Sequence, residues 1–397
     1  MREQRRWLLI LNTTFNMVLG FILPVNTIFI NKNLGEPLMT AGFVLMVYSG
    51  TMMVGNAIGG VMFDKFSKRG TLLIGYAISI TCLLIMSFHH VWPSYAFILA
   101  VLGFGMGLSY TAINAYTAFM AEQAYGDTRV IFNNMYLAAN MGIALGSTAV
   151  GFIFKASIFW TFFTPVIFFA LSIIIVLTKG NVLNYVNDKK DSTERKNTSD
   201  IIEHDPRALI GNKRFVLNLM IISLSVFLVW VGYSQWDSNM SVYILDQGLT
   251  TRDYGLVFTA NAASLLIIQP IVNRFISKIF KQFKYQLLLG TVIMGSSFLL
   301  LPSARTFWAF IVSMLVLTLG ESMVFPTIPA LLSKLSTRKN RGTIQSIYSI
   351  FGSLGRAAGP YVGSLIITWV SYSSLFIAIA ASMVLVGIAM LGIKEQS

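Results

Sequence analysis

The sequence predicts an all-α membrane protein in which twelve transmembrane helices form two six-helix bundles related by a pseudo-two-fold axis. Three observations predict this fold class. Of the 397 residues, 55% are hydrophobic and only 11% are charged, which is too little charge for the surface of a soluble chain of this length. Apolar stretches that can cross about 30 Å of hydrocarbon recur from one end of the chain to the other. One long polar segment divides them into two sets of six.

The apolar stretches are the predicted helices. The first follows a basic start and is too long for the apolar core of a signal peptide, so we interpret it as an uncleaved span. The fifth and sixth are separated mainly by Lys155, and the eleventh and twelfth by residues 371–374, so either pair is alternatively a re-entrant hairpin. In order, the predicted spans are 7–30, 40–63, 72–88, 95–120, 130–154, 158–177, 215–245, 254–275, 287–301, 308–332, 342–370 and 375–393.

The basic residues predict the orientation of the chain. Of the 29 Lys and Arg residues, 24 fall at the termini and in loops that share one side of the membrane, and the opposite loops hold only Lys32, Lys155, Arg252 and Arg305. Because basic loops stay in the cytoplasm, we expect a multi-pass protein of the cell membrane with both termini cytoplasmic. The net charge of +13 therefore marks topology, and we expect no nucleic-acid partner.

The polar segment at 179–213 is predicted to be a cytoplasmic linker. Its stretch 187–196 carries charges of alternating sign and almost no apolar residues, so the segment cannot bury enough surface to fold. The predicted organisation is an N-terminal bundle at 1–178, this linker, and a C-terminal bundle at 214–397.

The loop after the second span carries the most specific motif. Gly60 is followed by Asp64 and Lys65, and then by the basic pair Lys68 and Arg69. Asp64 can accept hydrogen bonds from the N-terminus of a neighbouring helix, and the cations can bind carboxylates or lipid phosphates. These contacts predict a latch that holds the cytoplasmic side closed. The alternative is that the basic residues only anchor the chain at the membrane surface.

This loop resembles the signature loop of the major facilitator superfamily, although Ser67 stands where the family usually has Gly. The resemblance implies a secondary transporter whose two halves rock about a central site and expose it to each side in turn.

Glycines in the fifth span provide a second resemblance. Gly142 and Gly146 are similar to the glycine-rich motif of the drug/proton antiporter branch of that superfamily, although Ser147 replaces the usual Pro. Small residues four apart let helix backbones approach closely, so ordinary helix packing is an alternative explanation. The second half has Gly355 and Gly359, each 213 positions after its counterpart, followed by Pro360.

Two carboxylates, Glu321 and Asp237, fall within predicted spans. Glu321 lies about 20 Å into its helix, and Arg356 reaches a similar depth in the next one, so the two could pair. A charge at this depth costs several kcal/mol unless it is paired or faces water. Glu321 is therefore either a permanent partner of Arg356 or a proton carrier in an aqueous cavity, and the second interpretation is adopted because the resemblance implies that the tenth helix lines the cavity. Asp237 is either a gate carboxylate or a solvated helix end.

Other polar residues share helix faces at intervals of three or four and are predicted to line the cavity, or alternatively to bond neighbouring helices. The residues on shared faces are Asn12, Asn16, Tyr110, Asn114 and Thr117, and the predicted cavity lining also includes Gln235 and the aromatic Phe325.

We expect a proton-coupled transporter that exports amphipathic or cationic drug-like compounds, with Glu321 and Asp237 carrying the proton coupling. The alternative is a carrier for one sugar or organic anion, with Arg356 as the anion contact, and a more remote one is a membrane sensor that transports nothing. No enzyme is expected, because the histidines lie in loops and no nucleophile has an evident base. The expected partners are a small-molecule substrate, protons and membrane lipids, for a monomer that uses no cofactor and no metal.

Overall fold

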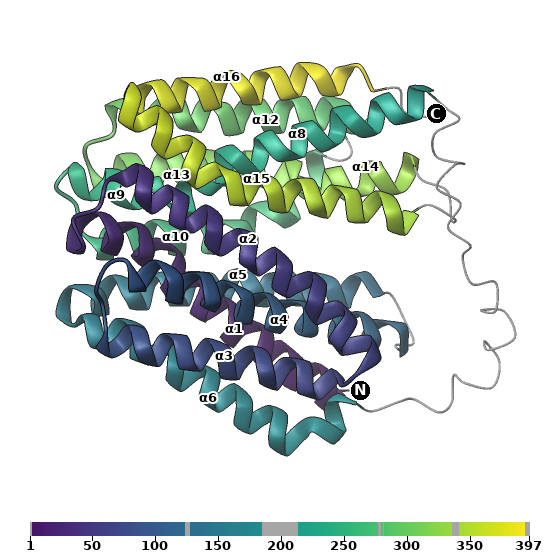
Figure 1. Ribbon diagram of the computed structural model, residues 1–397. Coiled ribbons are helices and arrows are strands. Elements are labelled where there is room, and N and C mark those ends of the chain that lie inside the picture. Colours follow the sequence, from purple (N-terminus) through teal and green to yellow (C-terminus); the bar gives the residue numbers. More distant parts are fainter. Residues whose placement is uncertain are drawn as a thin grey trace, which may run out of the picture. The chain divides into compact units, whose positions relative to one another are not determined.

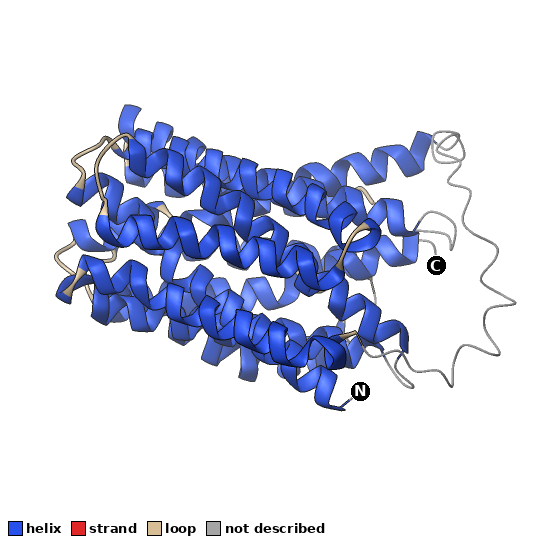
Figure 2. Cartoon of the chain, turned by 60° about the horizontal axis from the view of Figure 1, so that its bottom comes forward, coloured by secondary structure: helices blue, strands red, loops and turns tan. Residues whose placement is uncertain are grey.

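The computed structural model describes residues 2–123, 128–184, 213–276, 279–280, 282–335 and 341–393. Within these ranges the regular structure is entirely helical (Figure 2). The chain divides into two compact units: Met1–Asp200 with Thr250–Thr259, and Ile201–Leu249 with Ala260–Ser397. One boundary between the units, after Thr259, falls inside the helix Thr251–Ile271 of the second half.

The first unit contains the six helices of the N-terminal half, which are labelled in Figure 1, and the start of one helix of the second half. The six helices are α1 (Arg2–Ile28), which continues as the short π-helix η1 (Phe29–Asn33), α2 (Leu38–Lys65), α3 (Lys68–Phe88), α4 (Ser94–Gln123), α5 (Thr128–Ala156) and α6 (Ile158–Leu183).

The second half contains more and shorter elements, because several spans are interrupted. They are α8 (Lys213–Asp237), α9 (Asn239–Asp246), α10 (Thr251–Ile271) with η3 (Val272–Ile276), α12 (Phe283–Leu300) with η4 (Leu301–Ser303), α13 (Phe307–Val324), α14 (Thr327–Leu335), α15 (Arg341–Trp369) and α16 (Tyr372–Leu391).

Eleven helical segments of the described chain are long and apolar enough to cross a membrane. The remaining predicted span, the eleventh, is α15, which has 29 residues but is less apolar because it contains Arg356 and several glycines and serines. The fifth and sixth spans, and likewise the eleventh and twelfth, are separate helices and not re-entrant hairpins. Helix α5 has 29 residues, α6 has 26 and α16 has 20. Each of these is long enough to span the bilayer by itself.

The seventh and tenth spans, which were predicted to be continuous helices, are interrupted close to Asp237 and Glu321. The seventh breaks at Ser238, whose φ of −133° and ψ of −89° leave the helical region, so Asp237 is the last residue of α8. The tenth breaks before α14, where Pro326 lacks a backbone N–H and disfavours helical geometry in the residue before it. Glu321 lies in the last turn of α13.

The predicted packing glycines lie against helix backbones in both units. A Cβ atom on Gly146 would overlap the carbonyl of Met17, so α5 packs directly on α1. A Cβ atom on Gly355 would overlap the carbonyl of Phe227, so α15 packs in the same way on α8. Each unit therefore pairs its first helix with its fifth at close backbone distance.

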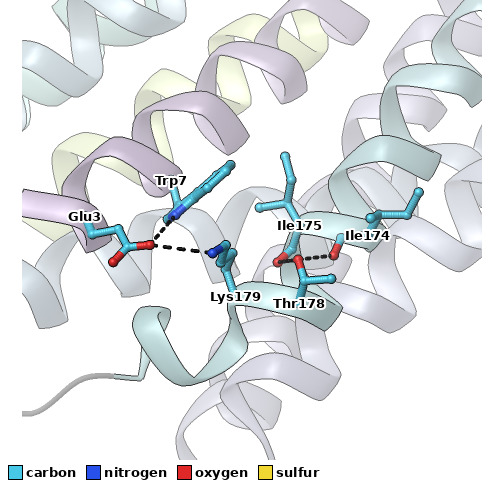
Figure 3. A network of polar contacts seen from close by, with 6 residues as sticks. All are labelled: Glu3, Trp7, Ile174, Ile175, Thr178 and Lys179. Atoms are coloured by element: carbon cyan, nitrogen blue, oxygen red, sulfur yellow. Dashed lines mark hydrogen bonds and ion pairs between the residues drawn. The ribbon is translucent and has the colours of Figure 1, made fainter.

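Helix α6 extends beyond the predicted start of the linker at residue 179. Its last turn binds α1, because the Gln4 side chain donates a hydrogen bond to the carbonyl of Leu183 at 2.8 Å. Lys179 Nζ lies 3.6 Å from Glu3 Oε1, which also accepts a hydrogen bond from Trp7 Nε1 at 3.3 Å (Figure 3). The first residues of the predicted linker are therefore helical, and its residues 185–212 lie outside the described ranges.

We expect Glu3→Gln to change the free energy of unfolding by less than about 0.5 kcal/mol, because exposed ion pairs gain little in water. The side chains of the ion pair, Glu3 and Lys179, are 59% and 38% exposed. Gln4→Ala is the matched comparison, since it removes a buried hydrogen bond worth about 1 kcal/mol from the same turn. Thermal unfolding of the purified variants in detergent measures both effects. A larger loss for Glu3→Gln than for Gln4→Ala would contradict this ranking.

Candidate functional site

Glu321 is buried and held by neutral hydrogen-bond donors. Its side chain is 3% exposed, and its Oε2 accepts a hydrogen bond from Asn261 Nδ2 at 3.1 Å. The Asn261 amide also donates to Thr318 Oγ1 at 2.8 Å, and the Tyr233 hydroxyl hydrogen-bonds to the carboxylate from α8. Among the residues that the structure describes, no ion pair to Glu321 is present within 4.0 Å. The carboxyl group can therefore gain or lose a proton without breaking a salt bridge.

The sequence of α10 and α13 fixes this geometry. Thr318 and Glu321 are three residues apart on α13 and so share one helix face, which meets Asn261 of α10. Further along the same pair of helices, the Gln269 side chain donates to the carbonyl of Ser322 at 3.1 Å. Two polar contacts thus hold α10 and α13 together on either side of the carboxylate.

Asp237 and Arg356 lie within electrostatic reach of this site. Asp237, half-buried at the end of α8, interacts through its charge with both Glu321 and Arg356. The three ionisable residues predicted from their depth in the membrane therefore belong to one cluster, supplied by α8, α13 and α15.

Arg356 contacts an aromatic ring. Its guanidinium carbon lies 4.0 Å from the centre of the Trp230 ring. Trp230 in turn packs against Phe325, with ring centres 4.7 Å apart, and against Tyr233 at 5.5 Å. We refer to Trp230, Tyr233 and Phe325 as the aromatic cluster, which joins the guanidinium to the carboxylate because Tyr233 also binds Glu321.

Gln235 has a structural position. It is fully buried, and its Nε2 donates to the carbonyl of Gly359 at 2.8 Å. Asn239 donates to Gln235 Oε1 at 2.7 Å and to the carbonyl of Pro360 at 3.1 Å. These bonds hold α8 and α9 to α15, so the predicted cavity residue Gln235 lies in a helix interface.

The other predicted lining residues fall into two groups. Asn12 is 6% exposed and donates to a backbone carbonyl of α5 at 2.7 Å, which agrees with the interhelical alternative. Asn16 and Thr117 are also buried and donate to carbonyls of their own helices at 2.8 and 2.9 Å. Tyr110 and Asn114 are exposed on α4.

The loop motif joins α2 to α3. Gly60 is half-buried within α2, whereas Asp64 and Lys65 are exposed at its end. Ser67 begins α3 as its N-cap, because its Oγ accepts a hydrogen bond from the backbone N–H of Gly70 at 2.9 Å. The residue that departs from the family pattern therefore satisfies a backbone donor that a glycine would leave to water.

The two basic residues of the closing pair bind within the first unit. Lys68 Nζ lies 3.4 Å from the ring centre of Phe119 on α4. Arg69 donates a hydrogen bond to the carbonyl of Leu177 on α6 at 2.7 Å. These two cations join α3 to α4 and α6.

Sequence reasoning missed Asn261, Trp230 and Tyr233. The only local signal for Asn261 was an amide within an apolar run, and its importance depends on which side chain α13 presents to it. Trp230 and Tyr233 are three residues apart in the sequence, a spacing that places them on the same side of α8.

Comparisons with known sequences identify the family. The profile of the Major Facilitator Superfamily matches residues 8–305 and 239–396. The uncharacterized MFS-type transporter YttB of Bacillus subtilis is 30% identical over 349 residues, which cover 88% of this chain and 84% of that protein. YqjV of the same organism is 25% identical over 91% of this chain and 86% of its own. The quinolone resistance protein NorA of Staphylococcus aureus is 24% identical over 145 residues, which cover 36% of this chain and 37% of NorA.

Solved structures show the same fold at lower identity. A POT family transporter bound to 5-aminolevulinic acid superposes with a TM-score of 0.80 at 16% identity, covering 98% of this chain and 95% of the other. The peptide transporter POT bound to sulfate gives 0.80 at 14% identity, with 98% and 94% covered. These matches confirm the predicted all-α transporter fold. The profile match and the relatedness to YttB show that the chain belongs to the Major Facilitator Superfamily of membrane transporters.

Proposed function

We propose that this chain is a proton-coupled transporter that exports amphipathic or cationic compounds by alternating access. The observation that carries the proposal is the buried Glu321 carboxylate, bound by neutral donors and joined through Tyr233 to a half-buried aromatic cluster. An acid and aromatic faces together attract an apolar cation. The partial similarity to NorA, which is named for quinolone resistance, supports drug-like substrates.

The proposed cycle alternates the charge of Glu321. The ionised carboxylate attracts a cationic substrate from the cytoplasmic side, and the aromatic cluster binds its apolar groups. A proton that arrives from the outside neutralises the carboxylate, weakens substrate binding and later leaves to the cytoplasm. A proton driving force of about 200 mV supplies about 4.6 kcal/mol, enough for a roughly thousandfold gradient of a neutral solute.

The proposed setting is the cell membrane, with both termini cytoplasmic and a monomer as the working unit. Substrate, protons and membrane lipids are then the partners. In this setting Asp64, at the end of α2, would lie on the cytoplasmic side, and we propose that it forms the latch there together with Lys65, Lys68 and Arg69.

We expect Asp64→Asn to slow transport about tenfold, because a charge-assisted hydrogen bond that closes the cytoplasmic side is worth about 1.5 kcal/mol. Substrate affinity in detergent should stay unchanged, since Asp64 belongs to the first unit and the aromatic cluster to the second. Initial rates and equilibrium binding measured on the same preparation separate the two effects. Equal rates for Asp64→Asn and the wild type would remove the latch from the proposal.

The function is tested by dye accumulation in vesicles. Purified protein is reconstituted, the lumen is made acidic to represent the cell exterior, and ethidium is added outside. We expect ethidium to accumulate in the lumen and to leave when a protonophore collapses the gradient. If ethidium accumulated to the same level with and without the protonophore, proton coupling would be excluded.

The alternative of one transported metabolite predicts another pattern in the same vesicles. A single sugar or organic anion would then move, unrelated cations would neither move nor inhibit, and Arg356 would be required as the anion contact. Inhibition of ethidium transport by several chemically unrelated cations supports the export of diverse compounds instead.

A further inference from the structure

The Arg356 side chain places a positive charge on the aromatic cluster. The Arg356 guanidinium lies 4.0 Å from the centre of the Trp230 ring, within the range of a strong cation–π contact. A guanidinium is planar and weakly hydrated, so it stacks well on an indole. The charge that an organic cation would bring to this ring is thus already present.

Trp230 is held so that the ring cannot easily turn away from this position. A Cβ atom on Gly352 would lie 3.0 Å from Trp230 Nε1, and one on Gly355 would lie 2.8 Å from the Trp230 Cβ. The ring therefore packs closely along α15, while Phe325 packs on it from the break between α13 and α14.

Arg356 is free to leave this position. Its side chain is exposed, whereas Trp230 is half-buried. Among the described residues Arg356 forms no salt bridge within 4.0 Å, so moving its guanidinium off the ring breaks the cation–π contact without breaking an ion pair. The negative charge of Asp237, which already acts on Arg356, remains within reach of the displaced cation.

We propose that Arg356 is a tethered competitor, which occupies the cation-binding face of Trp230 until an organic cation displaces it. This inference rests on the proposed function, since it takes the aromatic cluster as the substrate site. The favoured ligands are aromatic cations with delocalised charge, such as arylphosphonium ions, because these lose little hydration on stacking. A strongly hydrated ammonium competes poorly with a guanidinium for the same face.

The inference is tested by a double-mutant cycle on binding. The affinity for tetraphenylphosphonium is measured by calorimetry in detergent for the wild type, Arg356→Gln, Trp230→Leu and the double variant. We expect Arg356→Gln to tighten binding about fivefold, because the competing contact is removed. In the Trp230→Leu background the same change should give no gain.

Three controls sharpen this cycle. Arg356→Lys keeps the charge without the planar stacking group and should tighten binding less than Arg356→Gln. Triphenylphosphine oxide, a neutral analogue, must displace the guanidinium from the same ring face, so Arg356→Gln should bind it more tightly than the wild type, whereas repulsion at a distance would leave its affinity unchanged. If Trp230→Leu fails to fold, Trp230→Phe replaces it, and the gain from Arg356→Gln should shrink with the weaker ring.

A gain of equal size in both Trp230 backgrounds would show repulsion at a distance and overturn the proposal, as would unchanged or weaker binding by Arg356→Gln. The experiment needs no proton gradient. A transporter that binds the cation with the expected coupling but does not concentrate ethidium would therefore refute the proposed function and leave Arg356 as the competitor. Proton-driven ethidium transport without coupling between Arg356 and Trp230 would refute the role of Arg356 as a competitor and leave the proposed function in place.

Discussion

Glu321→Gln is expected to abolish uphill transport while the substrate still exchanges across the membrane. Glutamine matches the shape of glutamate and keeps an oxygen that accepts the hydrogen bond from Asn261. It cannot release a proton, so the ethidium gradient that the imposed pH gradient supports in the wild type should fall to equal concentrations on the two sides. Ethidium accumulation in vesicles with an imposed pH gradient measures the first effect, and exchange of labelled for unlabelled substrate measures the second.

Thr318→Val serves as the control for Glu321→Gln. It removes the other hydrogen-bond partner of Asn261 on α13 but leaves the carboxylate in place. We expect this variant to concentrate ethidium, although with weaker binding. If Glu321→Gln concentrated ethidium at the wild-type rate, the proton would have to bind elsewhere in the chain.

The same vesicles decide between the two interpretations of Asp237. A gate carboxylate that acts on Glu321 and Arg356 should be required for accumulation, so Asp237→Asn would lower it. A solvated helix end would leave accumulation unchanged.

Gly146→Ala is expected to destabilise the protein by more than about 2 kcal/mol, because the added Cβ atom overlaps the carbonyl of Met17. Backbone atoms cannot move aside as the end of a flexible side chain can, so α1 and α5 must separate along their contact. The unfolding midpoint of the purified protein in detergent measures this loss.

Gly50→Ala provides the matched comparison for Gly146→Ala. Gly50 also lies inside a helix, α2, but a Cβ atom there meets no other atom within 4 Å. Since alanine favours a helix over glycine by about 1 kcal/mol, this variant should be as stable as the wild type or more so. Equal unfolding midpoints for the two variants would refute the close α1–α5 contact.

The sequence predicted the features that depend on local composition. Span lengths follow from runs of apolar residues, and Gly142 and Gly146 were predicted to allow close packing because small residues four apart do so in any membrane helix. The depth of Glu321 followed from the helical rise alone. None of these predictions required knowledge of which helices are neighbours.

The partners of the site residues depend on tertiary neighbours and could not be predicted. Glu321 and Arg356 were placed at similar depth, but depth does not reveal that α10 presents Asn261 to the carboxylate and α8 presents Trp230 to the guanidinium. For the same reason, Gln235 was assigned to a cavity although the carbonyl of Gly359 binds it within a helix interface. Pro326 marks the break in the sequence as a residue that interrupts helices, although the predicted span 308–332 runs through it.

The interruptions in the seventh and tenth spans give each side of the membrane its own short arm. Helix α9 has 8 residues and α14 has 9, and they lie at opposite ends of the second half (Figure 1). A helix bends most easily where its hydrogen-bond ladder is already broken, so either arm can swing about its break while α8 and α13 stay in place. Asp237 and Glu321 lie beside these pivots, where the swing displaces atoms least. In the proposed transport cycle, the two carboxylates would therefore keep their positions while the ends of α9 and α14 move.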